Sequence, residues 1–473
     1  MTMSKRGLLY FGEPDASLVD NSSELDKVHV VQQIEAELKY GDRRKGLHTV
    51  VGVKGSGKTD LRKHIEAHEP AVILNLDVDN AILNLEADAT EAKSGIIMNV
   101  MSTVLLRAFA NHLETIQDSR IKRGAMNFLR RTKDAAGNIP EAIELSLAGV
   151  GKVSLGKLLK GAAPTVVKQT NDALFEDIME ALTASQLRGY ILIDDVEDII
   201  PGIEKNLLFL EGVARSLTTI NQRAGDKLHA LMFLKHGVWK SWTISPNEYD
   251  KVEDRVAFLS WDRASLVKMI ALRIASNRGL DSTQDAEQLW AAEFQWQGTF
   301  SEFTDELTGY CVNGPRDMVK LCNLAAIRAG DRDSPITLDH IRASLGDYSQ
   351  GKITSVAENY DALYPGITFL LKRAFRNAPG STMTAKELAD LIQQNILVDP
   401  DGQNDSNIER KLRSWPKERL ALLMYEVGVV GFRAGSDAIY VIESPVLSES
   451  DFMAQQEVVV HPAFRPHLNI PAQ

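Results

Sequence analysis

Cysteines, long apolar runs and an excess of positive charge are scarce or missing in this chain of 473 residues. Its two cysteines, Cys311 and Cys322, have no metal-ligand spacing and no histidine cluster near them, which argues against a disulfide framework or a zinc site. No run of about 18 apolar residues occurs, and the N-terminal stretch lacks the apolar segment of an export signal. We therefore expect a cytoplasmic protein with no membrane partner.

The charge balance also limits the partners. Lysine and arginine total 53 and aspartate and glutamate total 64, which gives a net charge of -11. Attraction of the whole surface to nucleic acid is therefore not expected, although local basic patches stay open. A chain that is 44% hydrophobic and 25% charged has the composition of a globular protein, and its length predicts about two to four domains.

A glycine-rich motif joins the first clear strand to a helix. The stretch Gly52–Thr59, GVKGSGKT, fits G-x-x-x-x-G-K-[ST] at every fixed position. Glycines let the backbone wrap round a phosphate, and the helix that starts near Lys58 directs its positive end at the same anion. Lys58 can neutralise the β and γ oxygens, and the Thr59 hydroxyl can ligate Mg²⁺. We expect ATP to be bound by Gly52, Lys54, Gly55, Ser56, Gly57, Lys58, Thr59 and Asp60.

A second motif supplies the carboxylate that a phosphate loop needs on a neighbouring strand. The stretch RGYILIDDVEDII (188–200) reads as a buried parallel strand that ends in Asp194 and Asp195. Asp194 is expected to hold Mg²⁺ through water, and Asp195 to polarise the attacking water. The alternative for both residues is an ordinary turn at a strand end.

Two more apolar stretches, 71–79 and 228–237, predict further buried strands of the same core. The second ends in Lys235, which could contact the γ-phosphate as a sensor. A solvated lysine at a strand end is the competing interpretation.

The two motifs are separated by an unusually long segment, about 90–187, which we interpret as a helical insertion. Residues 95–116 have helical periodicity. Between 117 and 170, ten basic residues stand against four acidic ones. This segment is interpreted either as a solvated insertion or as an arm that binds an anion or a partner.

A helical lid is predicted after the core, over 246–350. Its helices present two apolar faces, formed by Leu266, Ile270 and Ile274 and by Leu321, Leu324 and Ile327. Gly314-Pro315 interrupts the chain before a helix that carries Arg316 near its start, from where it could reach the nucleotide phosphates. Arg255 and Arg273 are the other arginines that a lid or a neighbouring subunit could present. Structural salt bridges are the alternative for all three.

The C-terminal part, 355–446, has the element order of a winged helix. Thr384 and Glu387 form a capping box before one helix, a second helix runs from Pro416 to Gly428, and 429–443 reads as a hairpin. A basic cluster near the last helix leaves DNA binding and protein docking both open; it consists of Arg410, Lys411, Arg413, Lys417 and Arg419.

Together these features resemble the STAND and KAP-type branch of P-loop ATPases, and most closely the standalone bacterial P-loop ATPases often encoded near antiviral defence genes. The resemblance rests on GVKGSGKT, ILIDD, MFLK and GPRD and spans about 40–445. It implies that Lys58, Thr59, Asp194 and Asp195 bind and process ATP, and that Lys235 stands where relatives more often have arginine. The lysine lacks the bidentate fork of arginine.

The expected architecture is an α/β P-loop NTPase of AAA+ or STAND type. It comprises a lead-in (1–45), a parallel-sheet core (46–245) with the insertion, the lid (246–350), the winged helix (355–446) and a tail (447–473).

The expected function is that of a nucleotide-controlled switch. Asp195 is one methylene shorter than the glutamate of fast AAA+ motors, which favours slow hydrolysis. We expect an ATP-controlled switch or scaffold that self-associates or acts on a protein effector. For such a switch, DNA is at most a weakly bound partner. The main alternative is a DNA-binding ATPase of origin-recognition type that uses the winged helix. A small-molecule kinase has less support, because no acceptor site stands out.

Overall fold

The computed structural model separates the chain into two compact units, which are described one at a time. The first comprises Met1–Val30, Val53–Ser56 and Ser260–Gln473, and the second comprises Val31–Gly52 and Gly57–Leu259. The structure describes residues 7, 10–19, 28–30, 47–68, 71–76, 85–86, 94–115, 153–154, 164–194, 207–243, 254–312, 314–361, 364–397, 414–435, 437–441 and 447–471.

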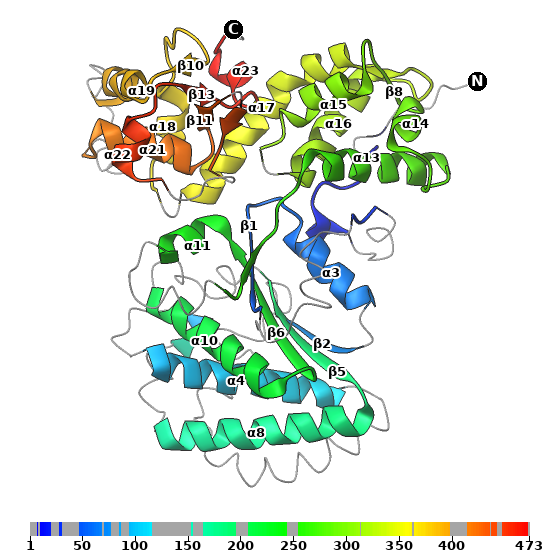
Figure 1. Cartoon of the computed structure of the whole chain (residues 1–473), viewed down its shortest axis with the longest axis vertical. Helices are drawn as coiled ribbons and strands as arrows, with labels where there is room; N and C mark the ends of the chain where they lie inside the picture. Colours follow the sequence, from blue (N-terminus) through cyan, green and yellow to red (C-terminus); the bar gives the residue numbers. More distant parts are fainter. Residues whose placement is uncertain are drawn as a thin grey trace. The chain divides into compact units, whose positions relative to one another are not determined.

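A five-stranded parallel sheet forms the centre of the second unit (Figure 1). Its strand order is β2-β5-β6-β1-β7. Parallel strands carry their carboxyl ends at one edge, where α/β proteins bind ligands. The strands are β1 (Thr49–Gly52), β2 (Ala71–Leu76), β5 (Arg188–Ile193), β6 (Leu228–Lys235) and β7 (Val256–Phe258).

Helices cover both faces of this sheet. Because side chains alternate along a strand, Val50 packs with α3 (Lys58–His68) on one face while Val51 joins the opposite hydrophobic cluster. That cluster is built by α4 (Ser94–Thr115), α10 (Leu207–Ala224) and α11 (His236–Thr243), and α8 (Pro164–Ser185) packs on α4 (Figure 1). The second unit is therefore a layered α/β domain like that of P-loop nucleotide-binding proteins.

The strands expected within 71–79, 188–200 and 228–237 are present as β2, β5 and β6. Residues 77–79 and 195–200 lie outside the described residues, and 236–237 begin α11. The strand β7 is an addition, because it lies within the range 246–350 that was predicted to be a helical lid, and 256–258 instead pairs with β1. With three residues, β7 is too short to show a period in the sequence.

The predicted insertion is described in part. Its described residues include the helices α4 and α8 and the strand β4 (Val153–Ser154), which pairs in parallel with β3 (Leu85–Glu86), a strand just before the insertion. Most of the basic segment 117–170 lies outside the described residues.

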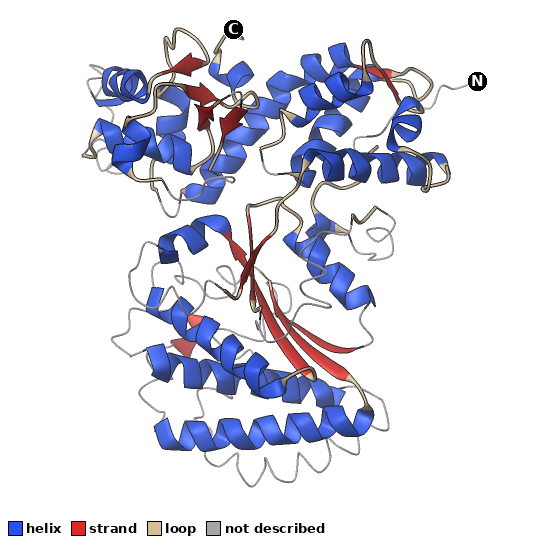
Figure 2. Cartoon of the chain, viewed as in Figure 1, coloured by secondary structure: helices blue, strands red, loops and turns tan. Residues whose placement is uncertain are grey.

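The first unit contains a helical part, formed largely by α13 (Arg263–Arg278), α14 (Ala286–Ala291), α15 (Phe300–Thr308), α16 (Pro315–Ala329) and α17 (Leu338–Tyr360) (Figure 2). The short strands β8 (Phe294–Gln295) and β9 (Ile336–Thr337) pair beside them.

Of the two apolar helix faces predicted for the lid, the one on α13 is confirmed and the one on α16 is confirmed only in part. Leu266, Ile270 and Ile274 are buried on α13, as predicted. On α16 the prediction is wrong for Ile327, which is 38% exposed. The buried face of α16 is instead lined by Met318, Leu321, Cys322, Ala325 and Ala326.

The C-terminal part of this unit contains the two helices and the hairpin that the sequence analysis names: α19 (Ala385–Ile392), α21 (Lys417–Glu426), β11 (Val430–Ala434) and β12 (Asp437–Ile439). It also contains α18 (Ile367–Arg373) and the π-helical turn η5 (Gln393–Leu397). The capping box of Thr384 and Glu387 is present, and Gly428 follows α21 at a φ of +77°. The winged-helix assignment itself stays a prediction.

The segment 447–473 is not a tail, in contrast to the prediction. It forms α22 (Glu449–Met453), β13 (Val458–Val460) and α23 (Arg465–Leu468). Strand β13 pairs antiparallel with both β10 (Thr382–Met383) and β11 in a sheet of order β10-β13-β11-β12. Val458 and Val460 are fully buried, so this segment is part of the C-terminal core.

The N-terminal segment also packs into the first unit. Phe11 is 1% exposed and its backbone N–H donates to Asn323 Oδ1 over 2.7 Å. A short 3₁₀ turn, η1 (Ala16–Leu18), follows it. Within the described part of the chain, no helix has the length and apolar character needed to cross a membrane.

Candidate nucleotide-binding site

The phosphate loop connects the end of β1 to the first residue of α3. Gly55 and Gly57 have φ values of +90° and +95°, a region that residues with a side chain rarely adopt. Lys58 is the first residue of α3, and the Leu61 N–H donates to Gly57 O over 2.9 Å. The motif therefore folds as a strand, a glycine-rich loop and a helix start, the arrangement that binds phosphate.

The second unit holds the half of the loop with the cation and the hydroxyl. Lys58 is 6% exposed and its ammonium donates to Gly52 O over 3.0 Å. Thr59 Oγ1 donates to Asp194 Oδ2 over 3.0 Å. Asp194 is 2% exposed, and its backbone N–H donates to Leu76 O. Two residues 135 positions apart, both predicted to bind the metal, are thus in direct contact.

The sequence analysis assumed that the strand before Asp194 is a neighbour of β1. This assumption is wrong, because that strand, β5, is not adjacent to β1 in the sheet. Strand β6 lies between β1 and β5. Its last residue, Lys235, stands opposite Gly52 in the β1–β6 register. Lys235 is half-buried and lies at the carboxyl end of β6, the strand next to β1, whose carboxyl end leads into the phosphate loop.

Arg62 is a member of the site that sequence reasoning missed. Its Nε donates to Asp194 Oδ2 over 3.2 Å, and its Nη1 donates to Glu66 Oε1 over 2.7 Å. The spacing of Thr59, Arg62 and Glu66 along one helix face is the signal that could have revealed it.

The first unit holds the tip of the loop, Val53–Ser56, together with the start of α16. The Arg316 N–H donates to Gly55 O over 3.3 Å, and a Cβ at Gly55 would lie 2.9 Å from Arg316 Cβ. Trp261 Nε1 donates to Ser56 O over 2.7 Å. Gly55 and Arg316, both predicted site residues, are therefore brought together, and Gly55 is needed for their close approach.

Arg316 is also tied to the N-terminal segment. Its Nη2 lies 2.6 Å from Asp15 Oδ2. The neighbouring Asp317 is buried and accepts hydrogen bonds from Lys352 Nζ over 2.9 and 3.0 Å and from the Val312 N–H over 3.0 Å. This buried pair fixes the first turn of α16 and, with it, the backbone of Arg316.

The other two candidate arginines are placed elsewhere. Arg255 precedes β7, and its carbonyl accepts from the N–H groups of His48 and Thr49 at the amino end of β1. That end is opposite to the phosphate loop, so Arg255 cannot serve a nucleotide bound to the same chain. Arg273 donates through Nη1 to Phe11 O over 2.6 Å, which holds the N-terminal segment.

Some of the residues predicted to bind nucleotide or DNA are partly or fully exposed or are held in ion pairs, and others lie outside the described residues. Lys54 is exposed and Asp60 is half-buried in the first turn of α3. Asp195 is outside the described residues, and so are Arg410, Lys411 and Arg413 of the basic cluster. The described members of that cluster are engaged: Lys417 Nζ lies 2.6 Å from Asp390 Oδ1 and Arg419 Nη1 lies 2.9 Å from Glu426 Oε2.

The residues present suit a nucleotide with Mg²⁺. Ser56 Oγ is buried without a hydrogen-bond partner among the described residues, and a phosphate oxygen would satisfy it. The described residues contain no cluster of three or more histidine, cysteine or acidic side chains able to hold a metal. A metal at Thr59 and Asp194 would therefore need further ligands, which phosphates and water supply.

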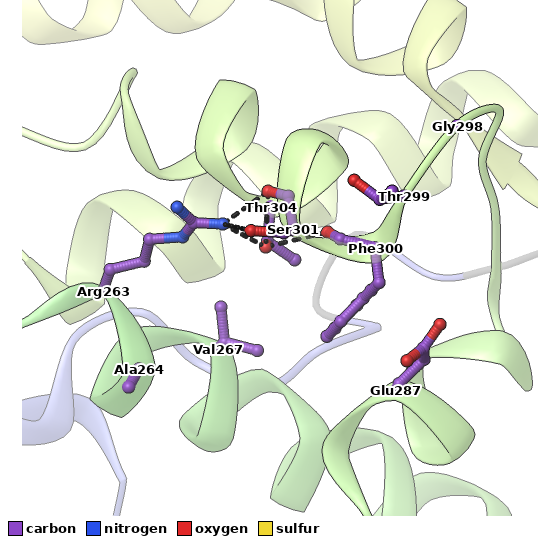
Figure 3. Close-up of a pocket in the computed structure, with 9 residues that line it drawn as sticks. All are labelled: Arg263, Ala264, Val267, Glu287, Gly298, Thr299, Phe300, Ser301 and Thr304. Atoms are coloured by element: carbon purple, nitrogen blue, oxygen red, sulfur yellow. Dashed lines mark hydrogen bonds between the residues drawn. The ribbon is translucent and has the colours of Figure 1, made fainter.

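A separate cavity of about 760 Å³ lies in the helical part of the first unit (Figure 3). Arg263 projects into it and donates to Thr304 Oγ1 over 2.9 Å, and it also contacts Ser301 and Asp305. The cavity is lined by Arg263, Ala264, Val267, Glu287, Gly298, Thr299, Phe300, Ser301 and Thr304. None of the predicted nucleotide-site residues is among them.

Comparison with known proteins finds one family match over part of the chain and a weak structural similarity. A family model described as the FunZ-associated C-terminal helical domain matches residues 264–357, within the helical part of the first unit. No curated protein matches the chain. The crystal structure of Cdc6p from Pyrobaculum aerophilum is similar at 12% sequence identity and a TM-score of 0.29, with 90% of each chain covered. At this level the fold assignment rests on the sheet order and the loop described above.

Proposed function

We propose that the chain is a P-loop ATPase that binds ATP with Mg²⁺ and hydrolyses it slowly. The contact between Thr59 and Asp194 carries this proposal. Two independent sequence motifs assign these residues to the metal, and one partly buried hydrogen bond of 3.0 Å joins them at the carboxyl edge of a parallel sheet.

The binding roles follow from the chemistry of the loop. The N–H groups of the glycine-rich loop and the start of α3 would hold the phosphates. Lys58 would direct its ammonium to the β and γ oxygens, and Thr59 and Asp194 would hold Mg²⁺, which neutralises phosphate charge.

The hydrolytic roles are assigned to three further residues. Asp195 would orient the attacking water and accept its proton. Lys235, opposite Gly52, and Arg316, beside Gly55, would each oppose the charge that develops on the γ-phosphate.

We further propose that ATP controls a switch in the manner of the STAND and KAP-type ATPases, with a role in antiviral defence. Slow hydrolysis lets the ATP state persist long enough to assemble the chain or to license a protein partner. The match to a C-terminal helical domain over 264–357 falls within the range 246–350 predicted for the lid over most of its length, which is compatible with a helical module after the nucleotide core.

The origin-recognition alternative has less support. It requires cations that are available to DNA phosphates, whereas Lys417 and Arg419 are paired with Asp390 and Glu426. The chain is also acidic overall. We expect DNA binding that is weak and lost as salt rises, because each phosphate contact adds about -0.9 to the slope of log K against log salt.

Two aspartate variants test the proposed roles. Asp195→Asn should keep Mg-ATP binding and lose turnover, because it retains the metal ligand and removes the base. Asp194→Asn should weaken Mg-dependent ATP binding. Phosphate release and nucleotide titration measure these effects, and light scattering with ATP or ADP reports the assembly state.

Other results would count against these roles. Equal hydrolysis by wild type and Asp195→Asn would remove Asp195 from the chemistry. DNA binding that survives about 200 mM salt, with no nucleotide-dependent change in mass, would favour the origin-recognition alternative.

A further inference from the structure

The carboxylate of Asp194 is shared by two donors from one face of α3. The Thr59 hydroxyl donates to Oδ2 over 3.0 Å, and Arg62 Nε donates to the same oxygen over 3.2 Å. Arg62 Nη1 extends the chain of contacts to Glu66 Oε1 over 2.7 Å. Residues three and four positions apart lie on the same side of a helix, so these three residues form one row.

Burial makes the charge of Arg62 important. The exposed fraction of the side chain is 8% for Arg62 and 3% for Asp194, compared with 28% for Glu66. A buried carboxylate without a partner is strongly destabilising, and an arginine stays charged at every pH a folded protein meets. Arg62 therefore places a positive charge directly against the carboxylate of Asp194, while the other side of its guanidinium pairs with the more exposed Glu66.

We propose that Arg62 is a positioning residue for the metal site, and that its charge makes divalent-cation binding depend on the phosphates of the nucleotide. This inference rests on the proposed function, in which Thr59 and Asp194 hold Mg²⁺. Arg62 orients the Asp194 carboxylate toward Thr59. A free cation at that carboxylate meets a fixed positive charge at a buried place, where charges interact strongly. The phosphates of ATP bring the negative charge that offsets this repulsion.

The test measures binding of Mn²⁺, a paramagnetic substitute for Mg²⁺, to nucleotide-free protein by electron paramagnetic resonance. Arg62→Gln removes the charge but keeps an N–H donor, so we expect it to bind Mn²⁺ at least about tenfold more tightly than wild type. Arg62→Lys keeps the charge and should bind as weakly as wild type. With ATP present, the difference in Mn²⁺ affinity between Arg62→Gln and the two proteins that keep the positive charge should become smaller.

A matched control removes another ion pair of the same spacing. Arg215 lies 3.5 Å from Glu211, one helical turn away on α10 in the same unit. Arg215→Gln should leave Mn²⁺ binding unchanged. Circular dichroism establishes that each variant is folded.

Two results would overturn the inference. One is equal Mn²⁺ affinity of wild type and folded Arg62→Gln, and the other is Arg62→Lys binding as tightly as Arg62→Gln. If Arg62→Gln does not fold, the melting temperature of wild type is measured instead. It should rise with Mg²⁺ and ATP together but not with Mg²⁺ alone. An equal rise with Mg²⁺ alone would overturn the inference. A wild type that binds no ATP refutes the proposed function instead.

Discussion

The buried histidines His48 and His461 are uncharged at neutral pH, because burial lowers the pKa of each from 6.5 to about 3. For His48 the charge of Arg255 adds to the effect of burial, and for His461 the charge of Lys352 does so. His461 Nδ1 accepts a hydrogen bond from the Ala463 N–H over 3.1 Å. His48 belongs to the second unit and His461 to the first, so each unit contains a buried histidine that resists protonation while folded.

Acid should therefore destabilise both units. Between the unfolded pKa of 6.5 and the folded value of about 3 the unfolded chain binds more protons, so stability falls as the pH drops below 6.5. From pH 7 to pH 5 each histidine should cost about 2 kcal/mol. Urea unfolding of wild type, His48→Gln and His461→Gln at both pH values measures this. A pH dependence that is unchanged in both variants would contradict it.

The helices α16 and α17 are joined by two ion pairs of very different burial. Asp317 and Lys352 are 5% and 4% exposed in their side chains, whereas Arg328 and Asp347 are 49% and 59% exposed. A buried pair is costly to break because the remaining charge has no water, while an exposed pair is screened. The buried pair also fixes the helix start that carries Arg316.

Lys352→Met should therefore destabilise the first unit by about 3–5 kcal/mol, since it leaves the Asp317 carboxylate buried and unpaired. Arg328→Met, which removes the exposed pair between the same two helices, should cost less than about 1 kcal/mol. Chemical denaturation compares the two variants, and the double variant Asp317→Asn with Lys352→Met should recover part of the loss. If Lys352→Met and Arg328→Met lower the free energy of unfolding by similar amounts, the buried ion pair does not stabilise the unit more than the exposed one, which contradicts the prediction.

At the scale of the whole chain, the sequence predicted what local patterns encode. The phosphate loop, the three long core strands and the capping box of Thr384 were predictable, because motif spacing, apolar runs and capping residues are local. The short strands β7 and β13 were missed, because three residues show no period and their pairing depends on distant partners.

Tertiary order explains the remaining differences. The sequence could not place β6 between β1 and β5, since strand order is set by helix crossovers. Arg62 escaped notice because a charged residue on a helix normally faces water, and only its contact with Asp194 reveals its role. Arg255 was a candidate until its position at the amino end of the sheet was known.

The most direct measurement is calorimetric titration of Mg-ATP into wild type and Lys58→Ala. Lys58 donates to Gly52 O in the loop, and removing its ammonium should weaken ATP binding by about a hundredfold or more, near 2.7 kcal/mol. Lys63→Ala, on the same helix and outside the loop, should bind like wild type, and circular dichroism should be the same for all three. Unchanged ATP affinity in folded Lys58→Ala, or no ATP binding by wild type, would contradict the assignment of the loop as a nucleotide site.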